Sequence, residues 1–216
     1  MVIFVLVVLA VVLIPALVQN HGYGVGKREV YRRPPCLNNL KQIALASIVW
    51  AGDHGDKFPV QVSVTNWGAK ELALAGDVAG IFCTMSNELI SPKTLFCPED
   101  RKRKTASDFG GDFNRTHVSY FVGIDVERKS SRQMILAGDD NLLVAGKQVQ
   151  SGILNLATNA PVEWTKERIK KTWSKGSHDL GNLALADGSA WQGSDKAQLL
   201  QKLTETGLAT NRLAIP

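Results

Sequence analysis

The sequence predicts an α+β protein with one membrane-spanning helix near its N-terminus and an antiparallel sheet in its soluble part. Three observations predict this class. Residues 2–18 form an apolar run without a charged residue, residues 36–53 repeat apolar side chains at helical spacing, and several short strand-like segments follow. With 216 residues, the chain is long enough for one domain with its own core and a separate anchor.

Residues 1–19 are expected to form the membrane anchor. As a helix, the apolar run would cover roughly 26 Å, close to the thickness of a hydrocarbon core. The side chains expected to contact lipid include Val2, Ile3, Phe4, Leu6, Leu13, Pro15 and Leu17. A cleaved signal peptide is the main alternative, but no basic residue precedes the run and no small-x-small cleavage site follows it. A retained helix is therefore the prediction.

Residues 20–35 are expected to form a linker, a broken stem between the anchor and the domain at 36–216. Their glycines and two prolines interrupt any continuous helix. The linker also carries Lys27, Arg28, Arg32 and Arg33, whereas no positive side chain precedes the anchor. The positive-inside tendency alone would therefore keep the domain in the cytoplasm.

The first soluble helix is predicted to start at residue 36 and to end at Asp53. Leu37, Leu40, Ala44 and Ile48 recur at helical spacing and form the stripe expected to face the core. Residues 60–64 alternate and predict a short strand. One or two short helices with loops are expected between 67 and 114, and the basic run at 101–104 is expected to be solvated.

The second half of the domain predicts the sheet. Strands are expected at 119–124, 134–137, 182–186 and 189–192. Asp187-Gly188 joins the last two as a two-residue hairpin turn, because Gly accepts positive φ and Asp tolerates it. Ser194 is expected to cap a closing helix that buries Leu199, Leu200 and Leu203.

Charge and cysteine content exclude several function classes. The formal net charge is +5, but no basic stripe interleaved with aromatics indicates a nucleic-acid partner. Cys36, Cys83 and Cys97 include no CxxC pair, so their spacing does not indicate a structural zinc site. One disulfide with one free thiol, or three unpaired thiols, both fit the sequence. His178 and Asp139 lack a GxSxG or HExxH motif beside them, so no enzyme is predicted.

Several blocks together resemble one family. They are the apolar run ending in LIPAL, CLNNLKQIALA followed by DHGDKFP, SNELISPKTLFCPEDRKR, VSYFVGID, MILAGDDNL and HDLGNLALADGS. In this order they are similar to prepilin-type, pseudopilin-like proteins of the Planctomycetes–Verrucomicrobia kind, the H-X9-DG group. The similarity covers most of the chain, from Ile3 to about Gln192. In this sequence eight residues, rather than nine, separate His178 from Asp187.

The resemblance implies a pilin-like fold and a non-catalytic structural protein related to type II secretion or type IV pilus assembly. It implies a single-pass protein of the cytoplasmic (inner) membrane, with residues 36–216 on the periplasmic side. The expected partners are the membrane and other pseudopilins, or further copies associating through the N-terminal helix. The family's prepilin peptidase site would align upstream of Met1, which leaves processing open. The alternative is a membrane-tethered extracytoplasmic binding domain that does not polymerise, which the broken stem favours.

The resemblance also implies particular site residues. It pairs Cys36 with Cys97 in a disulfide and leaves Cys83 as an addition. It assigns His178, Asp187 and Gly188 to the family motif. Some pseudopilins hold calcium beside their C-terminal sheet, and Asp139, Asp140, Asn141 and Asp187 supply oxygen donors of the kind that calcium prefers. Because no spaced calcium loop is present, no cofactor is predicted and calcium remains only a secondary hypothesis.

Overall fold

A computed structural model describes residues 35–128, 133–165, 181–193 and 195–216. The chain divides into two units, 1–33 and 34–216, and the described residues belong to the second. No helix in this described part is long and apolar enough to cross a membrane. The predicted anchor at 1–19, the linker up to residue 34 and His178 lie outside the described residues.

The centre of the domain is an antiparallel sheet of six strands in the order β5-β9-β1-β2-β7-β8. Its strands are β1 (Tyr120–Gly123), β2 (Ile135–Asp139), β5 (Gly152–Ala157), β7 (Gly181–Leu185), β8 (Ala190–Gly193) and β9 (Thr210–Ile215). A smaller antiparallel sheet has the order β4-β3-β6 and consists of β3 (Leu142–Val144), β4 (Lys147–Gln148) and β6 (Val162–Trp164). The predicted α+β class with an antiparallel sheet is confirmed.

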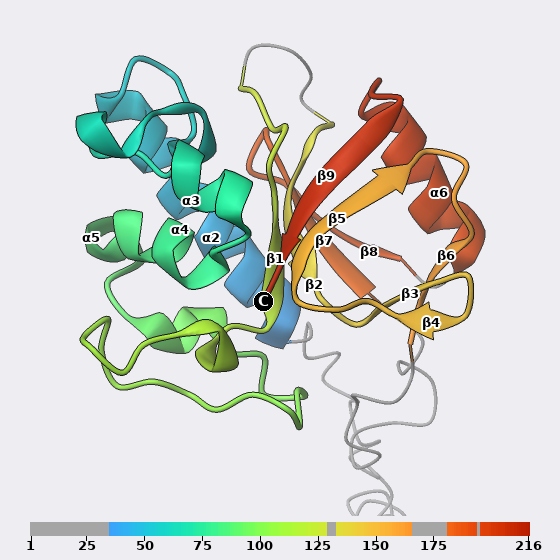
Figure 1. The fold of residues 1–216 in the computed structure, drawn as a ribbon, viewed down its shortest axis with the longest axis horizontal. Coiled ribbons are helices and arrows are strands. Elements are labelled where there is room, and N and C mark those ends of the chain that lie inside the picture. The colour runs from blue at the N-terminus through green and yellow to red at the C-terminus, as the bar shows by residue number, and fades with distance from the viewer. Residues whose placement is uncertain (1–34, 129–132, 166–180, 194) are drawn as a thin grey trace, which may run out of the picture. The chain divides into compact units, whose positions relative to one another are not determined.

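Helices cover one face of the six-stranded sheet, as Figure 1 shows. They are α2 (Pro35–Asp53), α3 (Lys70–Ala75), α4 (Val78–Thr84) and α5 (Ser86–Leu89), with the short 3-10 helices η1 (Pro59–Gln61), η2 (Val64–Asn66), η3 (Pro92–Leu95) and η4 (Arg115–His117). The small sheet and α6 (Lys196–Glu205) cover the opposite face. Each face has its own apolar core, so burial on both sides stabilises the central strands.

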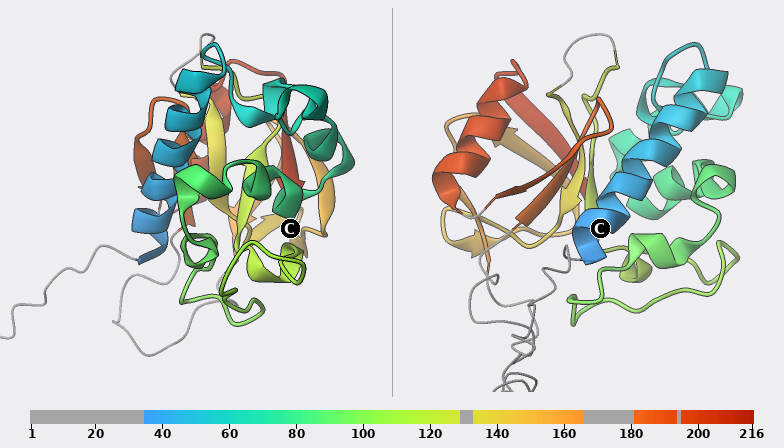
Figure 2. Two further views of the ribbon diagram at one scale, coloured as in Figure 1. Left: turned by 90° about the vertical axis from the view of Figure 1, so that its left-hand side faces the viewer. Right: turned by 180° about the vertical axis from the view of Figure 1, so that it is seen from behind.

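The helix α2 crosses the sheet and contacts β2, β7 and β8 (Figure 2). It ends at Asp53 as predicted. Its buried side is wider than the predicted stripe, because Ile43, Ser47 and Trp50 join Leu40 and Ala44 in the core. Leu37 and Ile48 are only half-buried. The remaining face exposes Leu45 and Val49 to solvent.

The strand predicted at residues 60–64 is wrong. This segment forms η1 and η2 instead. Pro59 at the start of η1 favours a helical turn, and the Gln61 side chain accepts a hydrogen bond from the Phe58 backbone N–H at 2.9 Å. The Ser63 hydroxyl accepts the Thr65 N–H at the start of η2. Local capping therefore overrides the alternation of apolar side chains.

The predicted closing helix is present as α6, but it does not end the fold. Asp195, rather than Ser194, caps it by accepting the N–H of Gln198 at 2.9 Å. Leu199 and Leu203 are buried and Leu200 is half-buried. After α6 the chain forms β9, which lies between β5 and β1 inside the sheet and which the sequence did not predict.

The Asp187-Gly188 turn joins β7 to β8, as predicted, but the connection is longer than two residues. Residues 186–189 separate the two strands. Gly188 has φ +87°, and a Cβ at this position would lie 2.9 Å from Cδ1 of Ile48 on α2. The glycine therefore meets two requirements, a positive φ and a close approach of the turn to α2.

Candidate functional site

A disulfide joins the first turn of α2 to the segment that precedes β1. Cys36 and Cys97 are bonded, with their Cα atoms 5.1 Å apart, which is the pairing that the resemblance implies. The Cys97 N–H donates to the Ser119 hydroxyl at 3.1 Å, and the Ser119 N–H donates to the Leu95 carbonyl at 2.9 Å. The start of α2 is thus covalently tied to a segment that is itself hydrogen-bonded to the sheet.

The third cysteine, Cys83, is a free thiol on α4. Burial is the main cause that raises the pKa of this thiol, and the nearby Asp77 carboxylate adds to the effect. A thiol whose pKa is raised is a poor nucleophile at neutral pH. Cys83 is therefore suited to packing rather than to thiol chemistry.

One turn beyond Cys36, Asn39 reaches from α2 to the sheet. Its side-chain amide donates to the Phe96 carbonyl at 2.8 Å and to the Tyr120 hydroxyl at 3.1 Å. These contacts lie beside the disulfide, because Phe96 precedes Cys97. Two independent connections, one covalent and one hydrogen-bonded, therefore fix the same end of α2.

Tyr120 begins a row of polar residues that crosses four neighbouring strands. Register places Tyr120 of β1 opposite Asp139 of β2, and Asn182 of β7 opposite Gln192 of β8. The β2–β7 register places Gly138 opposite Leu183, so Asp139 faces Asn182. We call Tyr120, Asp139, Asn182 and Gln192 the polar row; it lies at one end of the sheet on the side that α2 covers.

Hydrogen bonds connect the members of the polar row. Asp139 Oδ2 accepts the backbone N–H of Asn182 at 2.9 Å and its side-chain amide at 2.7 Å. The Gln192 amide donates to Asn182 Oδ1 at 3.1 Å. Asn182 therefore uses its backbone N–H and both ends of its side chain to join β2, β7 and β8.

The environment of the polar row alters the ionisation of its two titratable groups. Burial raises the pKa of Asp139 from 3.8 to about 7, and the two hydrogen bonds from Asn182 only partly oppose this effect. Burial, followed by the Asp139 charge, raises the pKa of Tyr120 well above its ordinary value. The row can therefore hold a proton on Asp139 near neutral pH while Tyr120 stays neutral.

A second polar centre surrounds Arg103. Its guanidinium donates to Asp140 Oδ2 through Nη2 at 2.9 Å and to the Arg115 carbonyl through Nη1 at 2.9 Å. Nη2 also donates to the Pro216 carbonyl oxygen at 2.9 Å. The prediction that the basic run at 101–104 is solvated is therefore wrong for Arg103, which is only 16% exposed and whose pKa burial lowers.

The structure does not gather the proposed calcium ligands. Asp139 binds Asn182, Asp140 binds Arg103, and Asp187 Oδ1 accepts the N–H and hydroxyl of Ser189 at 2.9 and 2.6 Å. The β2–β7 register puts Asp139 and Asp187 at opposite ends of the two strands. Asn141 uses its amide to bind the Thr165 carbonyl. Among the described residues, no group of three His, Cys, Asp or Glu is placed to hold a metal.

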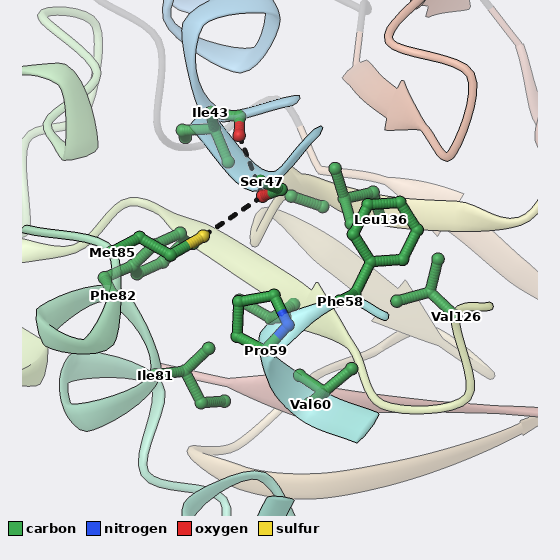
Figure 3. A pocket seen from close by; sticks show the side chains of 12 residues that line it. Ile43, Ser47, Phe58, Pro59, Val60, Ile81, Phe82, Met85, Val126 and Leu136 are labelled. Carbon is green, nitrogen blue, oxygen red and sulfur yellow. Dashed lines mark hydrogen bonds between the residues drawn. The ribbon is translucent and has the colours of Figure 1, made fainter. Parts of the chain in front are cut away.

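The interior cavity under α2 is too small for a ligand (Figure 3). It has a volume of about 10 Å³ and lies between apolar side chains such as Phe58, Phe82 and Leu136. Its polar member, the Ser47 hydroxyl, is already directed to the Ile43 carbonyl and the Met85 sulfur. A space of this size and lining is a packing defect and not a binding site.

An open groove of about 500 Å³ lies between α4 and the segment around η4. Asp77, Cys83 and Arg115 line it together with Phe113. Two of the polar members have structural partners, because Asp77 caps α4 through Gly80 and Arg115 donates to Ser151 at 3.0 Å. The groove is therefore a surface depression in which two of the polar side chains already have hydrogen-bond partners.

Sequence reasoning identified Asp139 but not its partners. Asn39, Tyr120, Asn182, Gln192 and Arg103 were missed, although Asn39 and Asn182 each place an amide within an otherwise apolar pattern. Such a polar interruption is the one signal that could have marked them. Comparison with protein families, curated proteins and solved structures finds no match for this chain.

Proposed function

We propose that this chain is a membrane-anchored, pseudopilin-like structural protein whose α+β domain lies outside the cytoplasmic membrane. In this role residues 1–19 hold the protein in the bilayer, where they associate laterally with further copies or with other pseudopilins. The domain presents a rigid surface on the far side. The function is scaffolding and involves no catalysis.

The observation that carries the proposal is the Cys36–Cys97 disulfide. Disulfides form and persist in oxidising compartments and are rare in the cytosol. The bond therefore favours an extracytoplasmic domain, even though the basic residues after the apolar run favour the opposite orientation. We give the disulfide more weight, because the positive-inside tendency is statistical and a stable protein disulfide depends on the chemistry of its compartment.

The position of the disulfide also suits an anchored domain. Pro35 and Cys36 begin α2 directly after the linker, so any pull from the membrane reaches the domain at this point. The disulfide and the Asn39 contacts transfer such a pull to β1 and its preceding segment, not to the helix alone. A structural protein under load benefits from this arrangement.

The alternative is a tethered binding domain that does not polymerise. The exposed side chains of Trp67 and Ile90 favour it, because 84% and 87% of their surfaces are open to solvent. Both residues also adopt positive φ values, near 63°, which hold these large side chains on turns. Trp67→Ala should leave folding unchanged and abolish partner binding if this alternative holds.

Fractionation of the full chain tests the proposal. We expect the protein to remain with the membranes after washing at high salt and alkaline pH. A variant lacking residues 2–18 should move to the soluble fraction and keep its Cys36–Cys97 bond if it is still exported. A full-length chain that washes off freely would overturn the anchored role.

A further inference from the structure

Strands β8 and β5 form the two edges of the six-stranded sheet. At one end, β8 contacts α2, which packs across β2, β7 and β8. At the other end, β5 pairs with β9 on its inner side, and no strand in the described part of the chain pairs with its outer side (Figure 1). The end of α3 reaches the start of β5, where Gly76 approaches Gly152 and Ile153, but the middle of the strand exposes Asn155. The outer side of β5 is therefore an edge of the kind to which another strand can add.

The hydrogen-bond pattern shows which backbone groups face outward. The Thr158 N–H donates to the Ala209 carbonyl at 3.3 Å, so residues 152, 154, 156 and 158 bond to β9. The intervening residues, Ile153, Asn155 and Ala157, direct their N–H and carbonyl groups to the outer edge. Within the described residues, the only bond from this set is the one that the Ala157 carbonyl accepts from Ala160.

The edge lacks the usual protection against strand addition. Exposed edges in natural sheets commonly carry Lys or other charges, proline, or a bulge. The stretch from Gln148 to Val162 contains no charged residue, and its proline, Pro161, lies beyond the strand. The β5–β9 pairing is regular over all six residues of β5, without a bulge. Ile153 adds an apolar side chain that is 42% exposed.

We propose that β5 is a self-association surface, which pairs antiparallel with β5 of a second copy around a two-fold axis at Asn155. In this register, Asn155 lies opposite Asn155 of the second copy, and Ile153 lies opposite its Ala157. The three outward-facing residues of each strand then meet the same three in the partner. The Asn155 pair exchanges N–H···O bonds in both directions. In each outer pair the Ala157 N–H donates to the Ile153 carbonyl, since the Ala157 carbonyl already accepts the Ala160 N–H, and the two sheets become continuous.

The side chains on β5 suit this register. The central pair consists of two amides, which can bond to each other, as paired polar residues do when they fix register. Leu154 falls opposite Leu156 of the second copy on the other face. Because β5 is neutral, self-pairing brings no like charges together, and an isologous two-fold contact needs no complementary partner surface.

This inference goes beyond the proposed function, because it concerns the folded domain and not the anchor. It does not depend on the anchor, although confinement in a membrane would raise the local concentration of copies and strengthen the pairing. The experiment must therefore detect pairing of β5 with β5, because association through the anchor alone would also give dimers.

Disulfide formation between cysteines introduced into β5 detects this pairing. The full chain would carry Cys83→Ser to remove the free thiol, and either Asn155→Cys or Ser151→Cys, both at exposed positions. Hydrogen-bonded pairs in antiparallel sheets have Cα atoms about 5.5 Å apart, within reach of a disulfide. Asn155→Cys should give a covalent dimer under mild oxidation. Ser151→Cys alone should not, because the two positions lie far apart in this register.

A mixed sample tests the register. Ile153 falls opposite Ala157 of the second copy, and both positions lie within β5, so Ile153→Cys mixed with Ala157→Cys should form a mixed dimer, whereas neither variant should dimerise alone. Equal crosslinking of Asn155→Cys and Ser151→Cys would show random collision, and would overturn the proposal. A crosslink from Asn155→Cys to a different protein would assign the edge to another partner, and would also overturn it.

Charge variants supply a second measurement. Asn155→Lys and Asn155→Glu each place like charges opposite each other at the two-fold axis, which should weaken self-association by about fivefold. An equimolar mixture of the two should recover a heterodimer. Retention of the monomeric fold is checked by an unchanged melting temperature at low concentration. Unchanged self-association in both single variants would contradict the proposal, whatever the fractionation of the anchor shows.

Discussion

Asp139 of β2 accepts two hydrogen bonds from Asn182 of β7, one from its backbone N–H at 2.9 Å and one from its side-chain amide at 2.7 Å. The Asn182 side chain continues the connection to Gln192 of β8. The carboxylate therefore belongs to a structural row across the sheet. Because this carboxyl is buried in the row, its ionisation should affect the stability of the folded protein.

Stability should fall as pH rises from about 4 to about 7. Burial raises the pKa of Asp139 to about 7 in the folded protein, from an ordinary value of 3.8. Between these values the folded state binds more protons than the unfolded state, so raising the pH favours unfolding. Well above the folded-state pKa both states are ionised at this position, and its contribution stops changing. Urea unfolding of the full chain across this range measures the slope.

Asp139→Asn should remove this slope. Asparagine keeps a carbonyl acceptor for Asn182 but carries no charge, so the variant should be more stable than the parent at pH 8, by on the order of 2 kcal/mol. Asp53→Asn, at an exposed position, is the matched control. If the parent and Asp139→Asn show the same pH slope while the control behaves like the parent, the burial of this carboxyl does not govern its ionisation.

Loss of the disulfide should destabilise the domain. Cys36 and Cys97 are 61 positions apart, and closing a loop of this length corresponds to about 4 kcal/mol in the chain-entropy model. Cys36→Ser with Cys97→Ser should lower the free energy of unfolding by roughly 2–4 kcal/mol. Cys83→Ser, which removes no bond, is the control. Peptide mapping without reductant that found Cys36 and Cys97 both free would contradict this prediction.

Asn39→Ala should destabilise the protein more than Asn38→Ala. Asn39 donates to Phe96 and Tyr120, whereas its neighbour Asn38 is exposed. Removing the amide leaves the Phe96 carbonyl without this donor, at an expected loss of about 1–3 kcal/mol. Asn38→Ala should change the free energy of unfolding by less than about 0.5 kcal/mol. Equal effects of the two substitutions would mean that the helix surface, and not the contact with the sheet, sets their effect.

Gly188→Ala should destabilise the β7–β8 connection. Alanine would be strained at φ +87°, and its Cβ would meet Ile48 at 2.9 Å. We expect a loss of about 1–3 kcal/mol in the free energy of unfolding. Gly111→Ala, at a position with no heavy atom nearby and no positive φ, is the control. Introducing Ile48→Ala together with Gly188→Ala should recover the part of the loss that is due to contact.

Calcium and chelator should leave the melting temperature of the protein unchanged. Asp139, Asp140 and Asp187 have separate protein partners, and strand register separates Asp139 from Asp187. Differential scanning calorimetry with millimolar calcium, and then with excess chelator, measures the effect. A reproducible rise with calcium that Asp187→Asn abolishes would restore the metal-site hypothesis.

The sequence allowed much of the fold to be predicted where the signal is local. The apolar repeat of α2, the apolar strand before Asp187-Gly188 and the amphipathic pattern of α6 each depend on neighbouring residues. The error at 60–64 was also local. There the alternating pattern competes with Pro59 and the Ser63 cap, which favour helical turns.

The polar row and β9 could not be predicted in the same way. Tyr120, Asp139 and Asn182 become neighbours only through strand order and register, because long segments of chain separate them. β9 enters the sheet between β5 and β1, an insertion that no local pattern specifies. The burial of Arg103 likewise depends on Asp140 and Pro216, which lie far along the chain.

Protease accessibility on intact spheroplasts tests the anchored, extracytoplasmic role most directly. We expect external protease to degrade the domain at 36–216 while a cytoplasmic control protein stays intact, and we expect the full-length chain to sediment with membranes before digestion. A domain that resists protease until the spheroplasts are lysed would place it on the cytoplasmic side and contradict the account.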